Sequence, residues 1–309
     1  MFERFFRDRS LNDSESYYSA LKSFKIDPQQ NLIDCKNRLG LQAATHYAQL
    51  YFTHHNRYKR LRREIELHRQ ESNPLNREVD VFIVTPPEKT IAKSSVRRFL
   101  RQSMGLCMSG QFAYVTPAQL HTDRVLLGAK RLYKLIEEKR KKQRKCIIVS
   151  YSFGSAFVRV MLDNMTKEEA STIKGWANVS GLIFGSPLFH CSDKKSLFYN
   201  VTGAQRSFSS EQRYFNSRLN TKGVKTVHFL GLKCDSGLGY QEWKRREALK
   251  AWGPNDGIIP YEPYRHVEQP VIPLIDQGHG IDLAGISSTF IRLLSSMVST
   301  LPSTVKKIE

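Results

Sequence analysis

The chain has 309 residues, 40% of them hydrophobic, and a formal net charge of +19 at pH 7. This length and apolar content allow a sizeable core and favour one α/β domain with additions. The sequence has no run near the ~18 consecutive apolar residues of a membrane span, and its first residues lack the apolar region of a signal peptide.

Cysteine usage predicts an intracellular, cytoplasmic protein. The five cysteines are widely spaced and include no C-x-x-C pair of the kind that binds metals. We therefore expect reduced thiols and no metal site. The five are Cys35, Cys107, Cys146, Cys191 and Cys234.

The positive charge favours acidic partners, which could be an anionic membrane surface, nucleic acid or an acidic protein. Most basic residues are scattered, as on a solvated surface, but two clusters occur at residues 57–63 and 139–145. The second cluster closes a predicted helix, where cations complement the helix dipole. Because no nucleic-acid-binding motif is present, nucleic acid is not expected as the partner.

Residues 1–76 form a predicted N-terminal helical extension, with no clear strand. Apolar residues recur at helical spacing over residues 41–70, and Asn73-Pro74 ends this pattern. We interpret the extension as packing on the main domain, although a separate interaction module is an alternative.

Residues 77–309 form the predicted main domain, in which strands alternate with helices. This alternation predicts a parallel sheet with helices on both faces. Helices are expected near residues 94–104, 123–140, after residue 154, and at 281–301. The expected strands are residues 79–85, 112–115, 146–149, 181–186, 224–232 and 271–275.

Residues 188–222 lie between two predicted strands and show no strand pattern. The segment is polar and dotted with aromatic residues. An insert of this length is usually functional or disordered. A lid over a site and a plain surface excursion are both open interpretations.

The segment Ser150-Tyr-Ser-Phe-Gly154 lies between a predicted strand and a predicted helix. It follows the pattern G-x-S-x-G with Ser150 at the first glycine, which is typical of a strained turn that presents Ser152 as a nucleophile. An ordinary strand-to-helix turn is the alternative for this pentapeptide alone.

A serine nucleophile needs a histidine base and an acid to orient that base. Of the nine histidines, only His279 lies on the loop after the last predicted strand, between two glycines. The candidate acids follow the strand before it. Asp256 lies in the turn Gly253-Pro-Asn-Asp-Gly257, and Asp235 lies immediately after the strand.

The order Ser152, Asp256, His279 resembles that of the α/β-hydrolase superfamily, in its lipase- and esterase-like branch. Residues 253–260, Gly-Pro-Asn-Asp-Gly-Ile-Ile-Pro, are similar to the acid loop N-D-G-x-V-P of lipases. The resemblance covers about residues 79–301. It implies a mostly parallel sheet of about six strands, an ester hydrolase activity and a catalytic Ser152–Asp256–His279 triad.

The resemblance also implies an oxyanion hole, to which Phe153 would donate one backbone N–H. The second donor would come from the loop after the first strand, where this chain has Thr85-Pro86-Pro87 instead of the usual His-Gly. Because proline has no N–H, Glu88 or Lys89 would have to supply it.

These residues predict a serine hydrolase that cleaves a carboxylic ester, with an ester or an acyl lipid as substrate and no cofactor. A thioesterase or acyltransferase would use the same triad. The proline pair motivates a further alternative, a binding protein of this fold with little activity. The basic surface is consistent with a protein peripheral to an anionic membrane.

Overall fold

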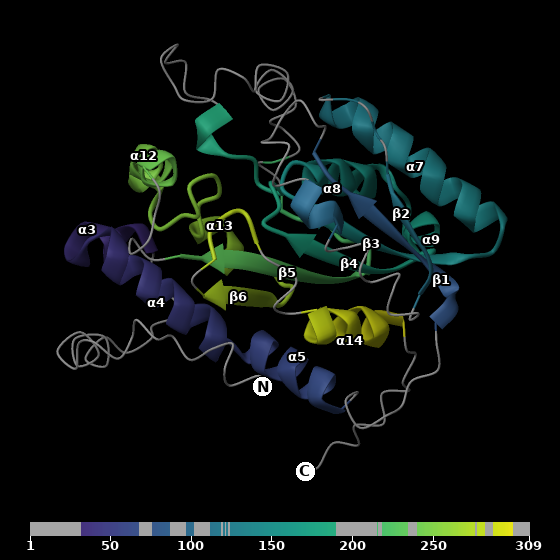
Figure 1. Cartoon of the computed structure of the whole chain (residues 1–309), viewed down its shortest axis with the longest axis horizontal. Helices are drawn as coiled ribbons and strands as arrows, with labels where there is room; N and C mark the ends of the chain where they lie inside the picture. The colour runs from purple at the N-terminus through teal and green to yellow at the C-terminus, as the bar shows by residue number, and fades with distance from the viewer. Residues whose placement is uncertain are drawn as a thin grey trace.

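The computed structural model describes residues 32–67, 76–86, 97–101, 112–118, 120, 122, 124–189, 215, 218–233, 240–275, 277–281 and 287–298. Six strands form one parallel sheet in the order β2-β1-β3-β4-β5-β6 (Figure 1). The predicted parallel α/β architecture is therefore confirmed. The strands are β1 (Asn76–Val84), β2 (Phe112–Pro117), β3 (Lys145–Tyr151), β4 (Ile173–Val179), β5 (Lys225–Leu232) and β6 (Val271–Ile275).

Helices cover both faces of the sheet. One core packs the sheet against α4 (Leu41–His54), α7 (Val125–Lys141) and α8 (Gly154–Asn164). The other packs it against α5 (Asn56–Leu67) and α14 (Ser287–Val298). The shorter elements are α3 (Leu32–Leu39), α9 (Lys167–Ala170), α12 (Tyr240–Ala248), α13 (Glu262–Arg265), η2 (Pro187–Phe189) and η4 (Lys250–Trp252).

Strand β3 shows how the sequence creates two cores. Cys146 and Ile148 belong to the core beneath α7 and α8, whereas Ile147, Val149 and Tyr151 belong to the core beneath α5 and α14. Successive side chains of a strand point to opposite faces, so a continuous apolar run is needed when both faces are covered. Strand β3 therefore lies in the middle of the molecule, with helices packed on both of its faces.

The expected strand at residues 181–186 is wrong, because the fourth strand is β4, Ile173–Val179. The chain leaves the sheet at Ser180, which has a φ of 41°. The apolar residues Leu182 and Ile183 belong to a loop, and their side chains are buried in the core against the sheet. The Leu182 N–H donates to the carbonyl oxygen of Ser152 at 3.0 Å, so this loop supports the turn after β3.

The expected helix over residues 41–70 is two helices. α4 ends at His54, and His55 takes an extended backbone with a ψ of 135° before α5 begins. The break lets α4 and α5 pack on different faces of the sheet. The side chain of Gln49 also donates to the carbonyl of Leu232 at 3.0 Å, which ties α4 to the end of β5.

Two of the basic residues in the 139–145 cluster pair with Asp80, and Arg140 pairs with Glu137. Asp80 of β1 lies 2.7 Å from the Lys139 ammonium and 2.5 Å from the Arg144 guanidinium. Burial raises the pKa of Asp80, but the hydrogen bonds and charges of these two cations outweigh it and hold the pKa below its ordinary value. The cluster therefore has an ion-pairing role besides its place at the end of α7.

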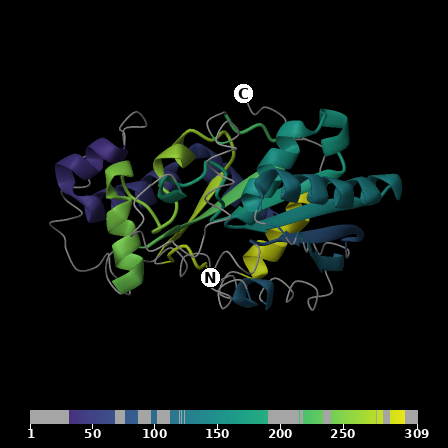
Figure 2. The same ribbon diagram turned by 90° about the horizontal axis from the view of Figure 1, so that it is seen from above.

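Figure 2 shows the same arrangement from above, with α12 and α3 at one end of the molecule and α7 at the other. Most of the insert predicted at 188–222, and with it the lid interpretation, lies outside the described residues. So do residues 1–31 of the predicted N-terminal extension.

Candidate active site

Ser152 lies at the tip of a tight turn between β3 and α8. Its φ of 52° is in the left-handed region, which is uncommon for residues other than glycine. The turn also explains Gly154, because an added Cβ would overlap the carbonyl oxygen of Val84 and lie 2.7 Å from its carbonyl carbon. The turn is thus pressed against the carboxyl end of β1.

Ser150 replaces the first glycine of the pattern and fills its position with a hydrogen-bonded hydroxyl. The Trp176 indole N–H donates to the Ser150 oxygen at 2.7 Å, and the hydroxyl of Ser155 lies 2.8 Å from it. All three residues are fully buried, so these bonds satisfy polar groups that would otherwise be costly. The serine is therefore compatible with the turn.

His279 follows β6 and reaches the turn after β3. Its Nε2 lies 2.8 Å from the Ser152 Oγ. Two contacts fix the loop that carries it. The Tyr151 hydroxyl donates to the His279 carbonyl at 3.2 Å, and Gly231 of β5 allows a close approach, since a Cβ there would overlap the Gly278 carbonyl.

Asp256 lies in the loop between η4 and α13, and its side chain is held from two sides. One carboxylate oxygen accepts the Ile258 and Ile259 N–H groups at 2.9 and 2.6 Å. The other lies 2.9 Å from His279 Nδ1. The buried Asn255 shapes the loop by accepting the N–H of Gly257 at 2.9 Å.

The arrangement favours one tautomer of His279. A carboxylate oxygen accepts hydrogen bonds, so the contact with Asp256 favours the proton on Nδ1 of His279. Nε2 is then unprotonated and accepts from the hydroxyl of Ser152. Ser152 and Asp256 are 1% and 2% exposed and His279 is 8% exposed, so little water competes with these bonds.

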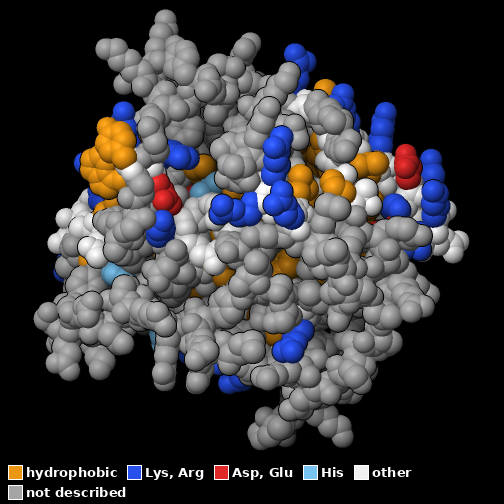
Figure 3. Space-filling model, viewed as in Figure 1, with side chains coloured by type: hydrophobic (Ala, Val, Ile, Leu, Met, Phe, Trp, Pro, Cys, Tyr) orange, Lys and Arg blue, Asp and Glu red, His pale blue; other side chains and the backbone are white. Residues whose placement is uncertain are grey.

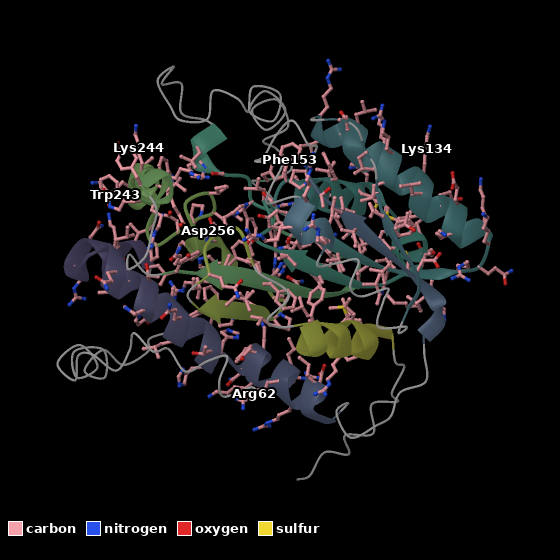
Figure 4. All side chains as sticks on the ribbon, in the orientation of Figure 1. Arg62, Lys134, Phe153, Trp243, Lys244 and Asp256 are labelled. Atoms are coloured by element: carbon pink, nitrogen blue, oxygen red, sulfur yellow. The ribbon has the colours of Figure 1, made fainter. Side chains whose placement is uncertain are left out.

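The remaining predicted site residues are Phe153, Glu88, Lys89 and Asp235. Phe153 caps the N-terminus of α8, beside Ser152, so its backbone lies at the positive end of the helix dipole (Figure 4). Glu88 and Lys89, which would supply the second oxyanion donor, and Asp235, the alternative acid, lie outside the described residues.

Sequence reasoning missed Tyr151 and Asn255, which position His279 and the acid loop. The sequence offered one indication of their importance, since each directly precedes a candidate catalytic residue. His228, in contrast, is buried in β5, where its Nδ1 lies 2.7 Å from the side-chain amide nitrogen of Asn178. Burial lowers the pKa of His228 to about 3 against an opposing interaction with the Gln269 side chain, so its imidazole is neutral near pH 7.

Within the described ranges, no cluster of three His, Cys, Asp or Glu residues is arranged to hold a metal ion. No helix in the same part of the chain is both long enough and apolar enough to cross a membrane.

No protein-family model matches the sequence, and no curated protein matches it. Solved structures do. A Bacillus licheniformis lipase, BlEst2 in mature form, matches with a TM-score of 0.50 and 16% identity over 74% of this chain and 94% of its own. A metagenomic carboxyl esterase, MGS0156, matches with a TM-score of 0.49 and 14% identity over 74% and 77%.

A thioesterase of the prodiginine pathway in Streptomyces coelicolor, RedJ, also matches, with a TM-score of 0.39 and 12% identity over 72% of this chain and 85% of its own. The likeness to the Bacillus lipase and the topology of the sheet both identify the fold. The chain has the α/β-hydrolase fold, as the sequence motifs predicted.

Proposed function

We propose that this protein is a serine hydrolase that cleaves carboxylic esters. The observation that carries the proposal is the hydrogen-bonded series from Ser152 through His279 to Asp256, with distances of 2.8 and 2.9 Å. Nucleophile, base and orienting acid in this geometry are what acyl transfer to a serine requires. The fold supports the proposal, because its active sites lie beyond the carboxyl ends of the strands, where these three loops meet.

In the first half of the reaction, Ser152 Oγ attacks the carbonyl carbon of the ester while its proton passes to His279 Nε2. Asp256 stabilises the imidazolium and holds Nδ1–H toward itself. When the tetrahedral intermediate collapses, Nε2 returns the proton to the leaving alcohol, and the acyl group remains on Ser152. In the second half, water loses a proton to Nε2 and attacks the acyl group, which releases the acid and restores the serine.

The negative charge on the tetrahedral oxygen needs hydrogen-bond donors. We assign one to the Phe153 N–H at the start of α8 and the second to the Glu88 N–H. Removal of one such donor costs about 10²–10³ in turnover in a serine protease. The second donor is therefore important, because Pro86 and Pro87 offer no N–H at the end of β1.

The substrate within this class is an ester or an acyl lipid. A thioester or an acyl acceptor other than water would use the same three residues, so these reactions are variants of the proposal. The proline pair favours one different function, a binding protein of this fold with little activity. Such a protein would hold ester-like ligands without turning them over.

Hydrolysis of short-chain carboxylic esters by the purified full chain tests the proposal. We expect turnover that Ser152→Ala abolishes and that Ser171→Ala, a change at an exposed serine, leaves intact. A parallel thioester series ranks the two leaving groups. Binding of substrate without turnover above the Ser152→Ala background would contradict the hydrolase and favour the binding protein.

A further inference from the structure

Exposed aromatic side chains gather on one short segment. Among the described residues, the exposed large hydrophobic side chains are Leu127, Tyr240, Trp243 and Trp252. Three of these four lie within residues 240–252, which comprise α12 and η4. All three are aromatic. Single exposed apolar residues are ordinary, but a group of aromatic residues on one element indicates an interaction surface.

α12 is two-sided. Tyr240 and Trp243 are 68% and 47% exposed, and their rings stack with centroids 6.3 Å apart. Lys244 is also exposed, and its place four positions after Tyr240 puts it on the same face of the helix as Tyr240. Arg246 of α12 and Leu249, which directly follows the helix, are buried at 1% and 0%. We call the outward group, Tyr240, Trp243 and Lys244 with Trp252 beyond it, the α12 patch.

The charge around the α12 patch is positive. Residues 240–252 contain four basic residues and two acidic ones. Glu242 contacts Lys233 at 3.2 Å, and Glu247 contacts Lys250 at 2.9 Å, so both acids have cationic partners. Figure 3 shows orange side chains bordered by blue ones over α12, at the end of the molecule where Figure 4 labels Trp243 and Lys244.

The inner side of α12 contacts both loops of the proposed site. A Cβ on Gly278, beside His279, would overlap the Glu242 carboxylate. The Asn255 amide, beside Asp256, donates to the backbone carbonyl of Arg246 at 3.3 Å. Helix α12 therefore carries the α12 patch on its outer side and contacts the loops of His279 and Asp256 on its inner side.

We propose that the α12 patch docks the protein on an anionic lipid bilayer. Tryptophan and tyrosine suit the bilayer interface because an apolar ring and a polar group share one side chain. Lys244 adds attraction to anionic headgroups, and the net charge of +19 supports the same approach. A second copy of the chain fits less well, because it would bring two strongly positive molecules together.

This inference rests on the proposed function, because it places the ester-cleaving loops next to a surface that holds acyl lipids. Docking through α12 would orient the His279 and Asp256 loops toward the bilayer. The substrate class then narrows to esters of membrane lipids, delivered from the surface and not from solution.

Co-sedimentation with vesicles tests the inference in the full chain carrying Ser152→Ala, which keeps the lipid intact. The vesicles are phosphatidylcholine alone and phosphatidylcholine with phosphatidylserine. We expect tighter binding to the anionic vesicles, weakening as salt rises. Lys244→Gln should reduce that affinity about fivefold, and Trp243→Ala about tenfold.

Matched controls lie on α7, at the other end of the molecule (Figure 4). Lys134→Gln removes the same charge and Leu127→Ala removes an exposed apolar side chain, so each should change vesicle binding less than about twofold if binding is local to α12. Equal losses in the α7 and α12 variants, or equal binding to neutral vesicles, would overturn the inference. So would an unchanged affinity of Trp243→Ala combined with a changed oligomeric state in sedimentation velocity, which would make the patch an interface between copies.

Separate measurements test the docking surface and the hydrolase activity. With Ser152 restored, Trp243→Ala and Lys244→Gln should hydrolyse a soluble short-chain ester at the parent rate. If the soluble ester is cleaved but α12 variants bind vesicles normally, the docking inference is wrong and the hydrolase stands. If vesicle binding follows α12 and no ester is cleaved, the docking surface stands and the proposed activity is wrong.

Discussion

Asp256→Asn should lower the turnover of a soluble ester by about 10⁴, as amidation of the orienting acid does in a serine protease. The contacts of the carboxylate explain the size of the effect. One oxygen accepts two backbone N–H groups, from Ile258 and Ile259, and the other accepts one, from His279. An amide has one acceptor oxygen, so it would turn that oxygen to the two backbone donors.

Its NH₂ group would then face His279 Nδ1, which would have to become the acceptor. The imidazole proton would move to Nε2, and Nε2 could no longer accept from Ser152, 2.8 Å away. A factor of 10⁴ corresponds to about 5 kcal/mol of lost transition-state stabilisation. The loop itself keeps its two backbone hydrogen bonds, so the thermal midpoint should hardly change.

The assay is kcat for a short-chain ester, with thermal unfolding as the check on folding. Asp235→Asn is the matched variant, because Asp235 is the alternative acid in the sequence. It should retain turnover within about tenfold of the parent, since the tautomer of His279 is set by the acid that bonds to its Nδ1, and we assign that role to Asp256. A loss below tenfold for Asp256→Asn, or the reverse ranking of the two variants, would refute the assignment.

Three further predictions concern stability. Gly154→Ala should lower the free energy of unfolding by about 1–3 kcal/mol because its methyl group would overlap the Val84 carbonyl; urea unfolding beside Gly280→Ala, where a Cβ meets nothing within 4 Å, checks this, and equal midpoints would contradict it. The pKa of His228, lowered to about 3 by burial, lies below the unfolded value of about 6.5, so stability should fall as the pH decreases between these values. That slope, measured by urea midpoints, should be smaller in His228→Asn, and an unchanged slope would oppose the cause given. Asp80→Asn should cost about 2 kcal/mol at neutral pH, less than a fully buried pair, because its cations are partly exposed. Since the pKa of Asp80 is held low, this difference should vanish as acid protonates the parent carboxylate, and a pH-independent difference would count against the ion pairs.

The sequence allowed prediction of the sheet, because apolar strands alternating with helices have few other solutions. It also placed Ser152, Asp256 and His279 on loops beyond the carboxyl ends of strands of one sheet. Parallel strands bring such loops together, so residues 104 and 127 positions from Ser152 could be expected to meet it. The distances between their side chains depend on tertiary packing, which a pattern does not specify.

The error at β4 has a physical cause. Gly175 and Asn178 are residue types depleted in strands, so residues 173–179 did not match a strand pattern. In the sheet Asn178 lies opposite His228 of β5, and its amide bonds to that imidazole at 2.7 Å. The amide nitrogen of a buried polar residue finds its partner fifty positions away, which local periodicity cannot detect.

The break at His55 was missed for a similar reason. No glycine or proline marks it, and the apolar spacing continues from α4 into α5. The chain bends because the two helices bury their apolar residues in different cores on opposite faces of the sheet. Ser150, by contrast, was an observable departure in the sequence, and only the Trp176 contact shows why a hydroxyl fits there.

Labelling with a fluorophosphonate tests the central claim most directly, because this reagent reacts with serine hydroxyls that a neighbouring base has activated. Peptide mass spectrometry of the labelled full chain should find one modified residue, Ser152, and labelling should disappear in Ser152→Ala and fall sharply in a variant that lacks the His279 imidazole. Labelling that persists in Ser152→Ala, or a folded parent protein that is not labelled at all, would contradict Ser152 as the activated nucleophile.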